Sequence, residues 1–599
     1  MTREGAEIDV EITTPHGAPV PSAAVRLVAR GGVFSGREIA PGRSRVVLPG
    51  RGDYELLVEP SGGAQGLALR PLRAALFFDP GAGERELRAL GGLGGTRSRI
   101  AQIRVEEGRR RVLVVLDYVW FTPAGMPPTL GNRVELLVDG EAGWGAVAEA
   151  MREARASIRL TTWSYQPSME LLRPDPLLDP AGREANTIHQ RLAARAKAGV
   201  LVQLLLWDWP LLPLAAEARR AALTAGDMFE VLTEKNPTER PIFAAGRFDL
   251  PNRLFGELTI GSYHQKTVMI DGRVGFCGGM NMRENDWDTR LHRLFDPRRC
   301  RFARPAAFRR RVEGRLAPAD HRPRHDFMAR LEGPGVSHLE ENFRQRWNGL
   351  VTRGAPYAEH ASLVPAPVPS TQSAGDSAVQ VVRTMPVPYE ERGILDVYLR
   401  AIAAARKLVY IEDQFFRSTY VSEALAEATR KNPSLAVLVV TPEGQANHPI
   451  TGSWSRACFE RIRASVRDFE LYSLRVACTD GRGKRRVEEV DMHGKLLLVD
   501  DELLMVGSCN VHDRGFEYEG ECNLAVVDPA LVSRVRLGLF EDYLGGDRRL
   551  GGGIAADVAL FREHAANNAR RPPACADHPY LVPFTPRSSK LGIFDRGVF

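Results

Sequence analysis

The pattern of apolar and polar positions changes near residue 128. Before that point, short runs such as AAVRLVA, SRVVLPG and RVLVVLDYVWF alternate apolar with polar side chains, and turns rich in Gly and Pro separate them. Alternation at every second residue is typical of strands with one buried face, and several short strands at this spacing predict a β-sandwich. The segment carries no candidate chemistry, so we interpret it as an accessory domain.

After residue 128, amphipathic helices alternate with apolar strands. WGAVAEAMREARASIRLTTWSYQP and LAARAKAGVLVQLLLWDWP are each a helix that runs into a strand, and the same order returns in LDVYLRAIAAARKLVYIEDQFF and LAEATRKNPSLAVLVVTPEG. Apolar strands of this kind predict sheets covered on both faces. The repeat indicates two α/β domains with mixed β-sheets flanked by helices. The predicted boundaries are 1–128 for the β-rich domain, 129–350 and 379–545 for the two α/β domains, 351–378 for a Pro/Ser/Ala-rich linker, and 546–599 for a Gly- and Pro-rich C-terminal tail.

Composition narrows the class of protein only a little. The 599 residues are 44% hydrophobic and 26% charged, and 80 basic against 74 acidic residues give a net charge of +6, too weak to indicate a nucleic-acid binder. Seven cysteines without a CxxC pair argue for a reducing compartment and against a disulfide framework or a zinc site. We see neither a signal peptide nor an apolar run of about 18 residues. We therefore expect a cytoplasmic protein or one peripheral to a membrane, and export as an effector is left open.

A histidine and a lysine stand two residues apart at two places in a chain that hardly uses lysine. Only eight of its 80 basic residues are Lys, yet one lies in YHQKTVMIDG and another in MHGKLLLVDD. Five positions recur with identical spacing. They are His264, Lys266, Asp271, Gly278 and Asn281 in the first copy, and His493, Lys495, Asp500, Gly507 and Asn510 in the second.

This set of side chains suits phosphodiester chemistry. Aliphatic residues around each lysine predict a strand, on which His and Lys share a face. Asp271–Gly272 predicts a hairpin turn that returns Asn281 to the level of His264. If two such copies face each other, one neutral imidazole can attack phosphorus while the other, protonated, donates to the leaving oxygen. Lysine and asparagine donors would bind the equatorial oxygens. No metal ligand spacing is present, so we expect no cofactor; calcium stimulation is left open.

The same residues also have simpler structural interpretations. A single HxK on an amphipathic strand would be an ordinary histidine, but two copies with the same spacing decide against that. Asp271 and Asp500 stand where a turn favours Asp, so we interpret them as structural. Cys277 and Cys509 are interpreted as small strand residues rather than nucleophiles.

The doubled pattern H-x-K-x4-D, followed by G-G/S-x-N, resembles the phospholipase D superfamily, and most of all its bacterial phospholipase D and phosphatidyltransferase type. HDFMARLEGPGVSHLEENFRQRWN and YIEDQFF also resemble segments of lipid-acting members. The resemblance implies a pseudo-twofold pair of domains with the site at their junction, and a phosphohistidine intermediate. It also implies that carboxylates support the histidines, Asp326 in the first half and Glu521 in the second.

The order of the motifs in the resembled family implies that His264 is the nucleophile and His493 the acid. Two departures from the family pattern stand out. Gly279 replaces a serine that Ser508 retains in the second copy, and about 40 residues rich in Arg separate Asn281 from His325.

Three features favour a phospholipid substrate at a membrane surface. The chain carries both motifs, so the site would form within one chain, which we expect to be a monomer. The segments 204–218 and 241–263 are apolar and aromatic, as an acyl groove would be, although core burial explains part of this. The third feature is the segment YIEDQFF, which is most similar to the corresponding segment of phospholipases D.

Against these, segment 298–324 holds ten Arg, which could follow a nucleic-acid backbone, dock on anionic headgroups, or form a salt-bridged loop. We predict a phospholipase D-type enzyme that releases phosphatidic acid and the headgroup alcohol. The alternatives are a phosphatidyltransferase of the cardiolipin synthase kind, a DNA or RNA phosphodiesterase, and a non-enzymatic scaffold.

Overall fold

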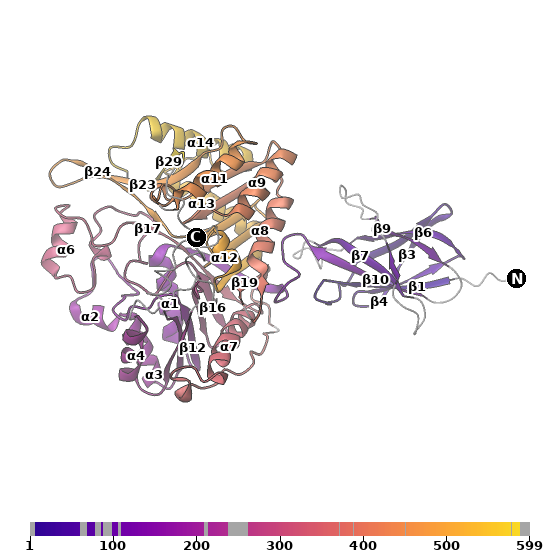
Figure 1. The fold of residues 1–599 in the computed structure, drawn as a ribbon, viewed down its shortest axis with the longest axis horizontal. Coiled ribbons are helices and arrows are strands. Elements are labelled where there is room, and N and C mark those ends of the chain that lie inside the picture. The colour runs from indigo at the N-terminus through magenta and orange to yellow at the C-terminus, as the bar shows by residue number, and fades with distance from the viewer. Residues whose placement is uncertain are drawn as a thin grey trace, which may run out of the picture. The chain divides into compact units, whose positions relative to one another are not determined.

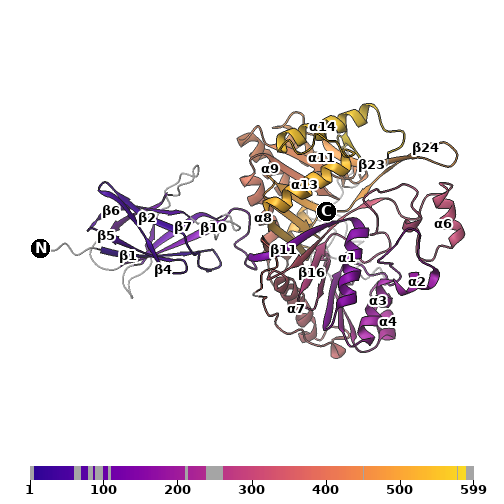
Figure 2. The ribbon, with the colours of Figure 1, turned by 180° about the vertical axis from the view of Figure 1, so that it is seen from behind.

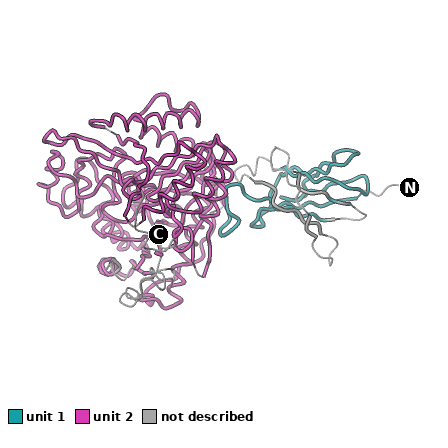
Figure 3. The backbone as a smooth tube through the Cα atoms, turned by 45° about the horizontal axis from the view of Figure 1, so that its top comes forward, with its two compact units in different colours: residues 1–127 teal, residues 128–599 magenta. Residues whose placement is uncertain are grey.

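The chain divides after Pro127 into two compact units, Met1–Pro127 and Pro128–Phe599 (Figure 3). The computed structural model describes residues 6–59, 69–77, 85–87, 99–105, 110–208, 214–235, 237, 261–370, 372–386, 388–449, 451–576 and 578–587.

The first unit consists of two β-sheets around a common apolar core, which confirms the predicted β-sandwich. One sheet has the strand order β4-β5-β1-β10-β7-β8 and the other β3-β2-β6-β9. Alternate residues of β1 face inward, where Ile8, Val10 and Ile12 are buried. The strands are β1 (Ala6–Thr13), β2 (Ala24–Ala29), β3 (Gly32–Ser35), β4 (Arg37–Ala40), β5 (Arg43–Leu48), β6 (Gly52–Glu59), β7 (Leu69–Phe77), β8 (Arg85–Leu87), β9 (Arg99–Val105) and β10 (Arg110–Tyr118).

The second unit contains the same mixed sheet twice, which confirms the predicted α/β class. The strand orders are β14-β13-β12-β15-β16-β18-β11 and β23-β22-β21-β26-β27-β28-β19. In each of these orders, the first three strands are parallel to one another, and every later neighbouring pair is antiparallel. The first half has β11 (Thr129–Val138), β12 (Ser157–Thr162), β13 (Leu201–Trp207), β14 (Phe229–Glu234), β15 (Thr267–Ile270), β16 (Val274–Gly278) and β18 (Phe327–Glu332). The second half has β19 (Ser377–Met385), β21 (Leu408–Asp413), β22 (Ala436–Val440), β23 (Leu471–Thr479), β26 (Lys495–Val499), β27 (Leu503–Gly507) and β28 (Glu521–Val527).

Amphipathic helices pack on the sheets of both halves (Figures 1 and 2). In the first of them, Trp144, Val147 and Met151 recur at helical spacing and are buried, as expected for a helix that covers a sheet. The helices of the first half are α1 (Asp139–Glu153), α2 (Pro180–Ala185), α3 (Ile188–Lys197), α4 (Leu214–Ala225), α6 (Ala306–Glu313) and α7 (Val336–Thr352), with the 3-10 helices η2 (Pro297–Arg299) and η3 (Ala358–His360). Those of the second half are α8 (Gly393–Ala404), α9 (Thr419–Lys431), α10 (Glu443–Ala446), α11 (Gly452–Arg463), α12 (Asp513–Glu517), α13 (Pro529–Tyr543) and α14 (Ile554–Arg570).

The two halves of the second unit are joined by backbone pairing. β11 pairs with β18 of its own half and with β19 of the other half, where Thr129 lies opposite Val379. At the junction, β17 (Arg324–His325) runs parallel to β25 (Asp491–Met492). This second contact matters for function, because it places the chain just before Asp326 beside the chain just before His493.

The described part of the segment predicted to be a C-terminal tail instead adds a helix and a strand to the second half. β29 (Tyr580–Phe584) pairs antiparallel with β23, so that Leu471 lies opposite Phe584, and α14 packs against it. The remaining short strands are β20 (Glu391–Arg392), which pairs with β19, and β24 (Arg485–Glu489), which pairs with β23. No helix in the described ranges is both long enough and apolar enough to span a bilayer.

Asp271 and Asp500 lie in the two hairpin turns, both with a left-handed φ of 54°. Each carboxylate accepts three backbone N–H bonds from the loop that leads into a neighbouring strand. The bonds to Asp271, from residues 155–157, are each 2.8 Å long, and those to Asp500, from residues 406–408, are 2.6–2.8 Å long. These contacts are those of a structural residue that fastens a helix–strand connection to the hairpin.

Asp271 and Asp500 allow a matched test of how much each carboxylate stabilises the fold. The N–H groups bound by Asp500 are more buried than those bound by Asp271, so water replaces them less well after truncation. We expect Asp500→Ala to lower the free energy of unfolding by about 3 kcal/mol, and Asp271→Ala by roughly half as much. Urea unfolding followed by tryptophan fluorescence reports this unit, because seven of the eight Trp follow residue 128. Equal losses in the two variants would show that burial of the donors does not set the cost.

Candidate active site at the junction of the two halves

The two motif segments meet at the junction, each just before a strand rather than on it. His264 and Lys266 precede β15, and His493 precedes β26. The predicted hairpins are present, since Thr267 pairs with Cys277 and Leu496 with Val506, and they return the two asparagines to the level of the histidines. The strand ladder begins only after the histidines, because at that point the backbone bonds to the other half instead.

Each histidine is attached by its backbone to the opposite half. The N–H of His264 donates to the carbonyl of Gly520 at 2.8 Å, and the N–H of His493 donates to the carbonyl of His325 at 2.7 Å. Gly520 precedes Glu521, and His325 precedes Asp326. The backbone contacts therefore bring a carboxylate of one half to the histidine of the other.

The side chains complete this crossed arrangement. Nδ1 of His264 lies 3.0 Å from Oε1 of Glu521, and Nδ1 of His493 lies 2.7 Å from Oδ2 of Asp326. Both predicted carboxylates reach the site, but their predicted pairing within each half is wrong. Because Nδ1 of each ring is engaged, Nε2 of each ring is left for the reaction.

Gly279 differs from Ser508 for a steric reason. A Cβ atom at Gly279 would stand 2.1 Å from Oδ1 of Asp326. In the second half, Oγ of Ser508 donates to Oε2 of Glu521 at 2.5 Å. The position of Asp326 therefore requires a glycine at residue 279, whereas Glu521 leaves room for Ser508 and accepts its hydrogen bond.

Gly278 and Gly507 also lie very close to atoms of the neighbouring strand. A Cβ atom there would stand 2.3 Å from the carbonyl of Phe327 and 2.4 Å from Oδ1 of Asn523. The recurring glycine of the motif thus allows the returning strand to lie directly against its neighbour.

The lysines and asparagines of the motif are buried beside the histidines. Nζ of Lys266 donates to the carbonyl of His264 at 2.5 Å, and Nζ of Lys495 donates to the carbonyl of His493. Oδ1 of each motif asparagine makes no hydrogen bond among the described residues, so each amide keeps hydrogen-bonding capacity for a ligand. These are Asn281 and Asn510.

Burial controls the ionisation of the site. It lowers the pKa of His264, with the charge of Lys266 acting in the same direction, and it lowers the pKa of His493, with Arg324 acting in the same direction. Both imidazoles are therefore neutral near pH 7 in the free site. Burial also lowers the pKa of Lys266 to about 7 and lowers the pKa of Lys495.

The orienting carboxyl groups respond in the opposite sense. Burial raises the pKa of Glu521 to about 8 and that of Asp326 to about 7. A bound phosphodiester adds a negative charge to this small volume, which favours protonation of an imidazole. The free site is thus poised to take up a proton together with its substrate.

Sequence reasoning missed two carboxylates at the site. Asp413 ends β21 opposite Lys495, and burial raises its pKa to about 7. Asp286 lies 3.1 Å from Arg324 and 3.5 Å from Nδ2 of Asn281. Asp413 falls within the YIEDQFF segment, which was a usable signal, whereas no spacing pattern singled out Asp286.

An aromatic pair stands on the first-half side. The rings of Trp163 and Trp207 stack at 5.2 Å, and Trp163 meets His264 edge to face at 6.3 Å. Of the predicted acyl-groove segments, residues 204–206 are buried in β13, whereas 209–213 and 241–260 lie outside the described residues.

A second buried cluster contains His325, the residue before Asp326, and has the composition of a metal site. The ligand atoms of Asp139, His292 and His325 lie within 4.8 Å of one another. Nδ1 of His325 is 2.8 Å from Asp139, and its Nε2 is 3.4 Å from Glu412. Against the effect of burial, the carboxylate of Asp139 raises the pKa of His325. Among the residues that the structure describes, these three could hold a metal ion outside the catalytic set, and sequence reasoning did not find them.

The Arg-rich segment is largely built into the fold. Arg299 is buried 3.2 Å from Asp288, Arg309 donates 2.9 Å and 2.7 Å bonds to backbone carbonyls, and Arg304 pairs with Asp320 at 2.6 Å. Most of this agrees with a salt-bridged loop. Arg310 and Arg311 are exposed on α6.

Two family models match the chain, one over each half. The model described as Phospholipase D covers residues 150–387, and the model described as Cardiolipin synthase, PLD-like domain, covers residues 398–539. The chain belongs to the phospholipase D superfamily. Each match contains one of the two motifs and one of the two crossed carboxylates.

Relatives in the phospholipase D superfamily are distant and often longer. Phospholipase D A of Dictyostelium discoideum is 26% identical over 444 residues, which are 66% of this chain and 32% of that protein. Phospholipase D alpha 2 of Oryza sativa subsp. japonica is 24% identical, over 67% of this chain and 63% of that protein. Cardiolipin synthase A of Pseudomonas entomophila (strain L48) is 24% identical over 70% of both chains. A solved phosphatidylserine synthase of Haemophilus influenzae Rd KW20 has a TM-score of 0.42 and 14% identity, over 69% of this chain and 86% of that one. The chain thus spans between about a third and two thirds of the phospholipases D it matches first.

The raised pKa of Glu521 predicts a pH-dependent cost of folding. Above pH 4.5, its usual value, the unfolded chain releases a proton that the folded protein keeps until about pH 8. Stability therefore falls across this interval by about 1.4 kcal/mol per pH unit for this group. We expect Glu521→Gln to melt with the wild type at pH 4.5 and clearly above it at pH 8. Glu502→Gln, in the turn between β26 and β27, serves as the control. An equal melting temperature of Glu521→Gln and wild type at pH 8 would contradict the assignment.

Proposed function

We propose that the protein is a phospholipase D-type phosphodiesterase, which hydrolyses a glycerophospholipid to phosphatidic acid and the headgroup alcohol. The observation that carries this proposal is the crossed arrangement of the histidines. Two imidazoles, each held at Nδ1 by a carboxylate of the opposite half, leave two Nε2 atoms for one phosphate, and a lysine stands beside each of them.

In the proposed first step, neutral His264 attacks phosphorus through Nε2. The bond between phosphorus and the headgroup oxygen breaks, and protonated His493 gives its proton to that oxygen. Lys266 and Lys495 stabilise the charge on the equatorial oxygens. Glu521 stabilises the positive charge that forms on the phosphorylated ring of His264.

In the proposed second step, water attacks the phosphohistidine. His493 takes a proton from the water, the bond between phosphorus and His264 breaks, and phosphatidic acid leaves. Both histidines return to their starting states, so the cycle balances. None of these steps needs a metal ion in contact with the phosphate.

Phosphatidyl transfer is the second candidate. The match of the second half to the model described as Cardiolipin synthase, PLD-like domain, favours it. The only difference is that an alcohol replaces water in the second step. A nucleic-acid substrate receives less support, because much of the Arg-rich segment is bonded within the fold.

Purified protein given mixed phospholipids and plasmid DNA in parallel distinguishes these candidates. We expect phosphatidic acid and free headgroup from the lipids and intact plasmid, with the rate on a soluble diester maintained in EDTA. Added glycerol would be converted to phosphatidylglycerol if transfer competes with hydrolysis. Cleavage of DNA with no lipid turnover would overturn the proposal.

The two histidines are expected to act as one unit. His264→Ala and His493→Ala should each lower kcat by several powers of ten, and the double variant should be little worse than either single variant. His360→Ala, at an exposed position, is the matched control. Near-normal turnover by either single variant would exclude the two-histidine mechanism.

The assignment of the nucleophile is tested by trapping the intermediate. A reaction with a substrate labelled in the phosphatidyl moiety, quenched without strong acid and digested, should yield label on the peptide that contains His264. Label on the peptide with His493 alone would reverse the two roles and leave the rest of the mechanism standing.

A further inference from the structure

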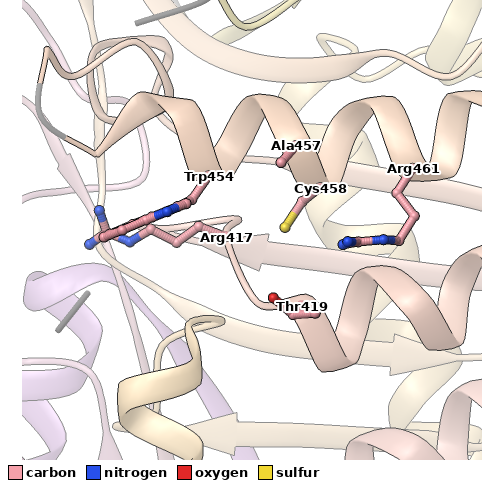
Figure 4. Close-up of a pocket in the computed structure, with 6 residues that line it drawn as sticks. All are labelled: Arg417, Thr419, Trp454, Ala457, Cys458 and Arg461. Carbon is pink, nitrogen blue, oxygen red and sulfur yellow. The ribbon is translucent and has the colours of Figure 1, made fainter. Parts of the chain in front are cut away.

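A cavity of about 290 Å³ lies in the second half, between α11 and the start of α9 (Figure 4). Four of its lining residues come from one face of α11, where they recur every three or four positions, and Thr419 is the first residue of α9. None of the six lining side chains is acidic. They are Arg417, Thr419, Trp454, Ala457, Cys458 and Arg461.

Two guanidinium groups give this cavity a positive charge. Arg417 is 7% exposed and lies 3.9 Å from the centre of the Phe415 ring. Burial, together with the charge of Arg514, lowers the pKa of Arg417 to about 9, so it stays charged at neutral pH. Nη1 of Arg461 donates to Oγ of Ser422 at 2.7 Å, and its Nη2 lies 3.7 Å from Glu423. Two arginines around one small volume favour an anion with several acceptor oxygens.

The residues that line the cavity make short, buried contacts with residues next to the active site. The N–H of Arg417 donates to the carbonyl of Val511 at 3.1 Å, and Val511 directly follows the motif asparagine Asn510. The charge of Asp413 acts on Arg417, and Asp413 lies opposite Lys495 in the sheet. The cavity and the catalytic lysine of the second half thus share one carboxylate.

We propose that this cavity binds an anionic group, a phosphate or a carboxylate, carried by the headgroup alcohol that leaves or enters. The inference rests on the proposed function, in which His493 of this same half protonates the leaving alcohol. The headgroup therefore stands on the side of the second half, where Arg417 and Arg461 attract an acidic substituent. A headgroup alcohol without one gains nothing from these two side chains.

Two anionic lipids separate the effect of the headgroup from that of the membrane charge. Phosphatidylserine and phosphatidylglycerol carry the same net charge, but only serine brings a carboxylate on the leaving alcohol. We compare kcat/KM for release of serine and of glycerol from phosphatidylcholine vesicles with equal fractions of either lipid. Arg461→Gln should lower serine release roughly tenfold, the effect of losing one hydrogen bond to a charged group, and keep glycerol release within about twofold. Arg463→Gln removes a charge from the same helix outside the cavity and should change neither.

A binding measurement keeps this inference separable from the proposed function. Glycerol 3-phosphate should raise the melting temperature of the wild type more than glycerol does, and Arg461→Gln should lose part of that gain while Arg463→Gln keeps it. Arg461→Lys, which retains the charge without the fork, should fall between them. If the wild type releases no serine, glycerol or choline, the proposed function fails and this measurement alone decides about the cavity. An equal gain in Arg461→Gln and wild type, or an equal loss of serine and glycerol release, would overturn the inference.

Discussion

The crossed pairing of histidine and carboxylate is the contact on which the site depends. Neither half of the second unit orients its own histidine, because the carboxylate that fixes each ring lies on the other half. The two pairs therefore require the halves to be held in register to within a hydrogen-bond length. The pairing of β17 with β25, and the bonds of Gly520 on either side of Tyr263, supply that register. Backbone hydrogen bonds are suited to fixing this register, because their donors and acceptors stand at regular, fixed positions along the chain.

This junction is also costly to build. Lysines, carboxyl groups and imidazoles that are almost completely buried lose most of their hydration, which costs several kcal/mol per ion unless a partner compensates. Further buried groups of opposite charge compensate part of this cost, such as Asp413 for Lys495 and Asp286 for Arg324. The shifted pKa values show that compensation is incomplete. A site of this kind is stabilised by the large sheets around it rather than by its own contacts.

Spacing predicted the motif residues and the duplication, because spacing along a chain is preserved when a fold is repeated. The resemblance to the phospholipase D superfamily, and not spacing, pointed to the two orienting carboxylates. The sequence could not predict which half each carboxylate serves. That choice depends on how two sheets meet, and no periodicity within one half records it. The start of the strands was also mispredicted, since aliphatic residues indicate a strand but not the point at which the chain leaves its ladder to bond across the junction.

Residues far apart in the chain were missed for a related reason. Asp139, His292 and His325 come from three separate segments, so no local pattern connects them. β29 was missed because its sequence, YLVPF, holds a proline. Proline is tolerated at the edge of a sheet, and Pro583 lies opposite Tyr472 on such an edge.

The position of β29 has a consequence for biosynthesis. Chains emerge from the ribosome N-terminus first, and domains fold as they are completed. The strand that covers the edge of β23 is made after the other strands of its sheet, and until it pairs, that edge offers open backbone groups to other chains. A nascent chain that has released only its first half also holds a histidine without its carboxylate. The order of translation therefore withholds both oriented histidines until the two halves have been made and have met.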